Sequence, residues 1–185
     1  LNDVDPDLVG WAYSHTTMCD ALAVLGWGVG WIESEAAMLV QPISRNIPKG
    51  VGFKLIGSLQ ECITATDVVL TITEILRKHG VVGKFVEFYG GGLNALSLSD
   101  RSTISNMAPE YGATCGFFST DNETIKYLEL CGKDDHQLEI VKNYTTVQKH
   151  WIDQSYKQHF DEELNLTLSK ISPSVRGSKV PQHKI

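Results

Sequence analysis

The stretch ITATDVVLTITEILRKHGVVGKFVEFYG, residues 63–90, contains the clearest helix and the clearest strand of this 185-residue chain. Thr64 precedes Asp67 by three residues, a spacing typical of the capping box that opens a helix. An apolar stripe follows at helical spacing and comprises Val68, Val69, Ile72, Ile75 and Leu76. We therefore expect a helix that begins at Thr64 and ends just before Gly80. The segment 84–89 then predicts a strand, which three consecutive glycines end.

Further helix and strand patterns alternate on both sides of this stretch. Strands are expected at 51–56, 114–118 and 164–168, and helices at 32–39, 99–107, 120–132 and 134–151. Thr120 with Glu123, and Asp134 with Gln137, are expected to cap the last two helices. Alternation of this kind predicts an α/β fold, with αβα layers around a mostly parallel sheet.

Two segments interrupt the alternation. GWGVGW, residues 26–31, resembles a phosphate-binding loop, but Trp31 stands where the G-x-G-x-x-G pattern needs its last glycine. We expect instead a tight, closely packed connection between two helical pieces. The segment Ser172–Ile185 holds two prolines and few apolar side chains, which predicts an extended C-terminal tail.

The composition excludes several classes of protein. With 42% hydrophobic and 21% charged residues the chain is typical of a globular protein, which argues against disorder. Its net charge of −6 disfavours non-specific binding to a phosphate backbone. The sequence has no apolar run long enough to span a bilayer and does not start like a signal peptide. We expect a cytoplasmic or mitochondrial protein, neither secreted nor bound to a membrane.

The four cysteines give no sign of a metal or redox site. Cys19, Cys62, Cys115 and Cys131 are widely spaced and form no C-x-x-C pair. We expect them to be reduced and mostly buried, with no metal bound by this chain.

Two short segments carry side chains that could perform chemistry. Ser14 and His15 are adjacent, but they lack the G-x-S-x-G elbow of a nucleophile; they could equally be a loop pair that caps the next helix. Asn106 and Glu110 precede a turn of small residues, where Glu110 could equally be a solvated carboxylate at a helix end. If the fold brings His15 to Glu110, they form a carboxylate-oriented imidazole suited to acid–base catalysis.

Long blocks of this sequence resemble one enzyme family. The blocks are SHTTM at 14–18, VLGWGVG at 24–30, IESEAAML at 32–39, QPIS at 41–44, residues 63–90 as quoted above, and DRSTISNMAPEYGATCGFF at 100–118. DNETIKYLELCGK follows, and the pattern continues more weakly to VRGSKVPQHKI. Over nearly its whole length the chain is similar to the aconitases, in particular the bacterial-type and cytosolic, iron-regulatory-protein-like branch.

This resemblance implies a function and roles for particular residues. Aconitases interconvert citrate and isocitrate by dehydration and rehydration through cis-aconitate, with a 4Fe–4S cluster as Lewis acid. By resemblance, Ser14 contacts the substrate, and His15 and Glu110 form a catalytic hydrogen-bonded pair. Asn106 would lie near the cluster. The resemblance also implies the remaining aconitase domains as partners, and RNA only by analogy with iron-regulatory proteins.

The chain departs from the family pattern in several places. Tyr13 stands where the family has an acidic residue before the Ser-His pair, and one residue is inserted there. Trp31 replaces a glycine, where its ring is expected to force a local rearrangement, and Arg45 replaces an apolar residue. The cysteines that hold the family's cluster come after the segment at which this chain ends. We therefore expect the isolated chain to be inactive.

The resemblance divides the chain into parts of a larger protein. Residues 1–40 correspond to the end of the first aconitase domain, 41–153 to a second α/β domain, and 154–185 to a linker toward the third domain. Two alternatives stay open. One is a hydro-lyase similar to 2-methylcitrate dehydratase. The other is a truncated, non-catalytic paralogue with a binding or structural role, including RNA regulation.

Overall fold

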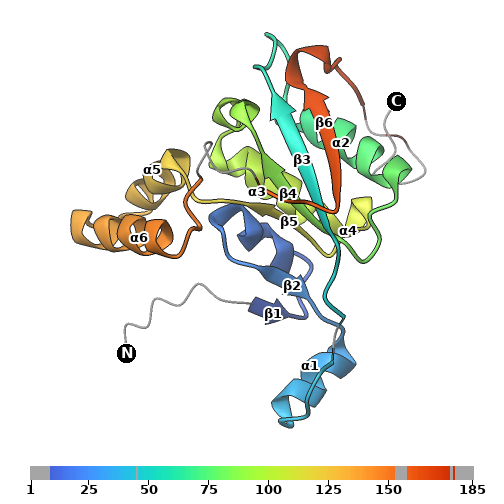
Figure 1. Cartoon of the computed structure of the whole chain (residues 1–185), viewed down its shortest axis with the longest axis vertical. Coiled ribbons are helices and arrows are strands. Elements are labelled where there is room, and N and C mark those ends of the chain that lie inside the picture. Colours follow the sequence, from blue (N-terminus) through green and yellow to red (C-terminus); the bar gives the residue numbers. More distant parts are fainter. Residues whose placement is uncertain (1–8, 45, 153–157, 176, 178–185) are drawn as a thin grey trace.

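Four parallel strands form the main sheet of the molecule. The computed structural model describes residues 9–44, 46–152, 158–175 and 177 (Figure 1). The strands are β3 (Gly50–Ile56), β4 (Phe85–Tyr89), β5 (Cys115–Phe118) and β6 (Glu162–Thr167), in the order β5-β4-β3-β6. In this register Val51 lies opposite both Val86 and Glu162. The expected α/β class with parallel strands is confirmed.

Helix α2 (Ala65–His79) covers one face of this sheet. Its apolar stripe is buried, with Val68, Ile72 and Leu76 inaccessible to solvent in one cluster with Phe53 and Leu55 of β3. Phe88 of β4 stacks on Phe118 of β5 with ring centroids 4.7 Å apart, which extends this core across the sheet. On the other face of the sheet, the Phe160 ring packs directly over Gly52, where a Cβ atom would collide with it.

The capping of α2 also holds down part of the C-terminal segment. Thr64 is the N-cap, and its side chain accepts a hydrogen bond from the Asp67 N–H, as the capping box predicts. The Asp67 carboxylate accepts from the Thr64 hydroxyl at 2.7 Å, from the Thr64 N–H at 2.8 Å and from the Ser174 N–H at 2.7 Å. These bonds, those from Thr64 foremost, lower the pKa of Asp67 to about 2. Ser174 therefore contacts α2, although the sequence placed it in an extended tail.

Replacing Asp67 with alanine is expected to lower the free energy of unfolding by about 1–2 kcal/mol, because a cap and the Ser174 contact are lost together. The pKa of Asp67 is lower in the folded than in the unfolded chain. The contribution of Asp67 to the free energy of unfolding is thus fully present above about pH 4 and is lost as the pH falls toward 2. Urea denaturation followed by circular dichroism at pH 3 and pH 7 measures this difference. Asp100→Ala is the matched control, since Asp100 makes an exposed capping box in α3 (Leu98–Asn106) without a Ser174 equivalent. Equal losses for the two variants would contradict a stabilising Ser174 contact.

A second, smaller sheet precedes the main one. Strands β1 (Val9–Trp11) and β2 (Gly26–Gly28) pair in parallel, and a 3-10 helix, η1 (Thr16–Leu22), connects them. The prediction of a simple connection at 26–31 was therefore wrong, because its first three residues form β2. The expected close packing is confirmed, since a Cβ on Gly26 would collide with the Thr16 carbonyl and the Cys19 sulfur.

Helix α1 (Trp31–Met38) follows β2 and projects away from both sheets (Figure 1). It contains no buried residue, and the Trp31 side chain is 81% exposed. The predicted crowding around Trp31 is therefore absent from the described part of the chain. Arg45, the other departure beside this helix, lies outside the described residues.

Helices α5 (Asn122–Leu130) and α6 (Asp135–Val147) form a hairpin to one side of the sheet (Figure 1). Asp134 caps α6 through the Gln137 N–H as predicted, although the helix ends at Val147 rather than near Trp151. Thr120 was wrongly predicted as the cap of α5. Asp121 takes that position because its carboxylate accepts from the Glu123 and Thr124 N–H groups. Among the described residues, no helix combines the length and apolar character that crossing a bilayer requires.

Strand β6 is the last strand of the main sheet. The alternating leucines predicted it, and it pairs with β3 from Val51↔Glu162 to Ile56↔Thr167. Lys84 and His79 bind the Glu162 carboxylate at its first residue, at 2.7 and 2.5 Å. The short 3-10 helix η3 (Leu168–Lys170) and the buried Ile171 follow. Part of the segment 154–185, expected to be a linker, therefore completes the sheet, and residues 154–157, 176 and 178–185 of it lie outside the described part.

Candidate active site

The fold brings two of the predicted site segments together. Ser14 and His15 lie in the turn between β1 and η1, and Asn106 is the last residue of α3. His15 Nδ1 is 2.9 Å from the Asn106 side-chain oxygen, although the residues are 91 positions apart. An amide oxygen only accepts hydrogen bonds, so Nδ1 carries the proton. In the neutral ring, Nε2 then keeps its lone pair and is free to exchange a proton with a ligand.

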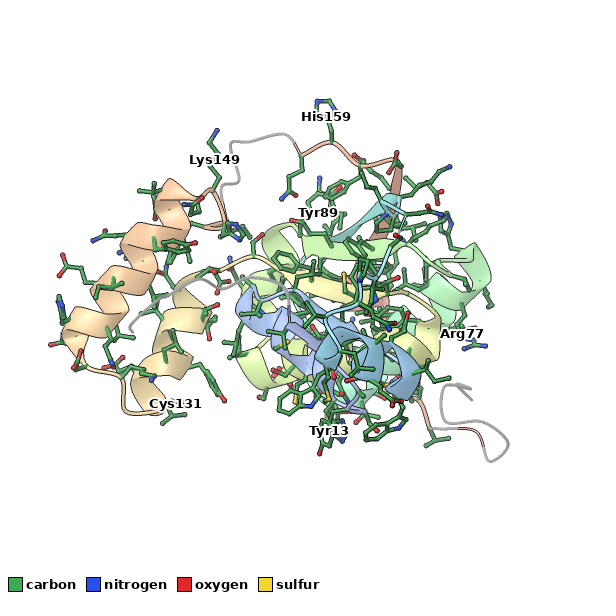
Figure 2. The ribbon with its side chains drawn as sticks, turned by 90° about the horizontal axis from the view of Figure 1, so that it is seen from below. Tyr13, Arg77, Tyr89, Cys131, Lys149 and His159 are labelled. Atoms are coloured by element: carbon green, nitrogen blue, oxygen red, sulfur yellow. The ribbon has the colours of Figure 1, made fainter. Side chains whose placement is uncertain are left out.

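Two further contacts hold this pair. The Thr17 hydroxyl of η1 donates to the Asn106 carbonyl at 3.5 Å, and the Tyr13 ring meets the His15 ring edge-on with centroids 5.4 Å apart. Tyr13 and the neighbouring Ser14 are exposed, and Figure 2 shows Tyr13 at the edge of the molecule. The alternative that Ser14 and His15 cap the next helix is only partly right: His15 occupies the cap position of η1, but its side chain makes no capping hydrogen bond. The His15 side chain is therefore exposed and not used for capping, as a residue that contacts a ligand must be.

Glu110 lies close by in the chain, in the one-turn helix α4 (Ala108–Tyr111). This helix ends at Gly112, whose φ of +93° turns the chain toward β5. The Glu110 main-chain oxygen accepts from the Arg77 guanidinium. Its side-chain Oε2 is buried, with no hydrogen-bond partner among the described residues. The structure therefore joins His15 to Asn106, and the His15–Glu110 pair stays a prediction. Since an unpaired buried oxygen is costly, Glu110 has the capacity to accept such a partner.

The sequence analysis missed Asp20, a buried residue five positions after His15. Asp20 of η1 is fully buried, and its two carboxylate oxygens accept from the Gly26 and Gly116 N–H groups at 2.5 and 3.3 Å. Burial raises the pKa of Asp20 to about 8, against the opposite effect of these two bonds. An acidic residue within the otherwise small and apolar segment CDALAVLG, residues 19–26, is the signal that could have identified it.

The cysteines do not form a cluster site. All four are free; Cys115 is buried and Cys19 half-buried, whereas Cys62 and Cys131 are exposed, so the expectation that most are buried was wrong for these two. Burial and the nearby Asp20 raise the pKa of Cys19 to about 11 and that of Cys115 further still. In the described ranges, no three His, Cys, Asp or Glu side chains converge as a possible metal site. Separate, protonated thiols do not fit the set of thiolates that an iron–sulfur cluster needs.

Comparison with known proteins identifies the family. A family model described as the aconitase family (aconitate hydratase) matches residues 5–185. The chain belongs to the aconitase family. It is 60% identical over 181 residues to aconitate hydratase A of Legionella pneumophila and 54% identical over 180 residues to that of Escherichia coli. Each comparison covers 97% of this chain and 20% of the relative, so the chain spans about a fifth of the length of these aconitases.

Proposed function

We propose that this chain is a segment of an aconitate hydratase that interconverts citrate and isocitrate through cis-aconitate. The contact between His15 Nδ1 and the Asn106 side-chain oxygen is the observation that carries this proposal. It joins two of the segments that resemble the family, SHTTM and NMAPEYGAT, and it leaves the second ring nitrogen of His15 without a hydrogen bond among the described residues. Membership of the aconitase family supports the same reaction. The relatives compared above are bacterial proteins, which favours a cytoplasmic over a mitochondrial location.

The proposed roles follow from the geometry of the site. His15 exchanges a proton at Nε2 with the hydroxyl group that leaves in dehydration and returns in hydration. Asn106 holds the ring and keeps the proton on Nδ1, and the exposed Ser14 hydroxyl binds a substrate carboxylate. Glu110 pairs with His15 when substrate and the rest of the protein close the site. The 4Fe–4S cluster would supply Lewis-acid chemistry when bound, and its cysteine ligands would lie outside this chain.

We also propose that residues 1–40 complete a first domain whose other part lies outside this chain. A parallel sheet of only two strands, β1 and β2, is too small to be stable alone. Next to it, α1 exposes a set of large apolar side chains: Trp31, Ile32, Met38 and Leu39. The second domain would begin near residue 41 and include β6, because β6 pairs with β3. Residues beyond Ile171 would lead toward the third domain.

Extension of the reading frame beyond Ile185 is the first test of this proposal. The full-length protein should continue into cysteine-containing cluster segments. After anaerobic reconstitution with iron and sulfide, it should convert citrate and isocitrate through cis-aconitate, followed by ultraviolet absorbance. A stop codon at the end of this chain would contradict the proposal and favour the non-catalytic paralogue. A marked preference for 2-methylcitrate would favour the alternative hydro-lyase.

A further inference from the structure

Asp20 connects the two sheets of the molecule through one side chain. Oδ1 accepts from Gly26 of β2 at 2.5 Å, and Oδ2 accepts from Gly116 of β5 at 3.3 Å. The side chain is inaccessible to solvent, so water does not replace either bond. Asp20 follows His15 by five residues, within the 3-10 helix that begins directly after it. The carboxyl group therefore fixes this helix both to its own sheet and to the main sheet.

The strand that Asp20 binds is also tied to the segment that carries Asn106. The Gly116 carbonyl accepts from the Ser105 hydroxyl at 2.6 Å, and Ser105 directly precedes Asn106. Ser105 is fully buried, like Asp20. A continuous path of buried hydrogen bonds thus runs from η1 through Gly116 to the end of α3. Asp20, at one end of this path, follows His15 by five residues, and Ser105, at the other end, directly precedes Asn106.

We infer that Asp20 is a positioning residue that holds the His15 turn against Asn106. This inference rests on the proposed function, since it assigns a role in preparing the same site. Asp20 does not touch the site, and it acts by setting the place of η1 relative to α3. The Thr17–Asn106 bond, at 3.5 Å, is long and adds little to the His15–Asn106 contact.

Asp20 performs this role as a neutral acid. The groups that face it are the Cys19 thiol on η1, the Cys115 thiol on β5 and the Tyr111 hydroxyl on α4, and no cation is among these described neighbours. Burial raises the pKa of Asp20 to about 8. As the pH rises through about 8, the carboxyl group loses its proton and a buried charge develops beside the Gly26 and Gly116 N–H groups.

Nuclear magnetic resonance on the full-length protein, labelled at its histidines and glycines, tests this inference with two variants. In Asp20→Ala, exchange of the Gly116 amide is expected to accelerate at least about tenfold, since its acceptor is lost. The ¹⁵N shifts of the His15 ring should move toward an average of both tautomers, while amides of α2 keep their protection. Asp20→Asn cannot ionise and keeps one carbonyl acceptor, so it retains the bond from Gly26 or the bond from Gly116, and the His15 signals should change less than in Asp20→Ala. In the unchanged chain the His15 signals should show an inflection near pH 8 that is missing from Asp20→Asn.

The outcomes separate the alternatives. A folded Asp20→Ala chain with unchanged His15 signals would overturn the inference. If Asp20→Ala does not fold, Asp20→Asn decides: an inflection near pH 8 that persists in this variant overturns the role of Asp20, and its loss supports it. These signals do not depend on turnover. If the full-length protein lacks aconitase activity while His15 still responds to Asp20, the proposed function fails and the positioning role stands.

Discussion

Replacing His15 with glutamine in the full-length protein is expected to lower kcat for hydration of cis-aconitate by about 10²- to 10⁴-fold, the usual contribution of a positioned acid–base group. Glutamine retains polarity and approximate length but does not exchange a proton near neutral pH. His15 is exposed, so replacing it should disturb folding little. KM should change much less than kcat, because the proposed role lies in the chemical step.

Asn106 and His159 provide graded controls for this experiment. Asn106→Leu should reduce kcat less, by about tenfold, because it removes the acceptor that fixes the tautomer and leaves the imidazole in place. His159→Gln should leave kcat unchanged, since His159 is exposed and lies at the opposite side of the molecule from Tyr13 (Figure 2). Full activity of His15→Gln, with cluster content equal to that of the unchanged protein, would remove His15 from the mechanism.

Replacing Arg101 with methionine is expected to cost about 3–5 kcal/mol of stability, the usual result of removing one partner from a buried ion pair. Arg101 of α3 is completely buried, and its Nη2 donates to Asp121 at 2.7 Å and to the Leu93 carbonyl at 3.1 Å. Its guanidinium also lies 5.9 Å from the centre of the Phe118 ring. Methionine fills similar volume but leaves the Asp121 carboxylate, whose side chain is 10% exposed, without its cation.

Urea denaturation of the unchanged chain and of Arg101→Met measures this loss of stability. The matched control is Lys126→Met, which breaks the Lys126–Glu123 pair on the surface of α5. That pair has the same charges and a similar distance, 2.6 Å, but the Lys126 side chain is 68% exposed, so the expected change is below about 0.5 kcal/mol. A similar small change for Arg101→Met would show that burial does not strengthen the Arg101–Asp121 interaction.

Local patterns predicted the elements whose signals lie within a few residues. The capping box of Thr64 and Asp67 and the apolar stripe of α2 are correct, because a helix buries side chains at a spacing set by its own geometry. The two elements of the small sheet, β1 and β2, were missed. Each is three residues long and is held by a partner strand and by close packing of Gly26, not by its own propensity.

The candidate site shows the same division. The sequence indicated Ser14, His15, Asn106 and Glu110 as site residues, partly through the family resemblance, and it predicted His15 with Glu110 as the pair. The structure joins His15 to Asn106 by a hydrogen bond, and the His15–Glu110 pair stays a prediction. Asp20 and Arg101 were not identified as buried residues, because charged side chains are usually exposed and only the fold shows which neighbours bury them.

By itself, the sequence therefore determined the α/β class, the main helices and strands, and the family. These depend on periodicity, caps and long matching blocks, all of which can be read along the chain. Only the tertiary structure decided which residues meet: His15 with Asn106 across 91 positions, and Asp20 with Gly116 across 96. The physical reason is that a hydrogen bond depends on distances of about 3 Å and on exclusion of water. Both are set by how α3, η1 and β5 pack, and neither is encoded in any short segment.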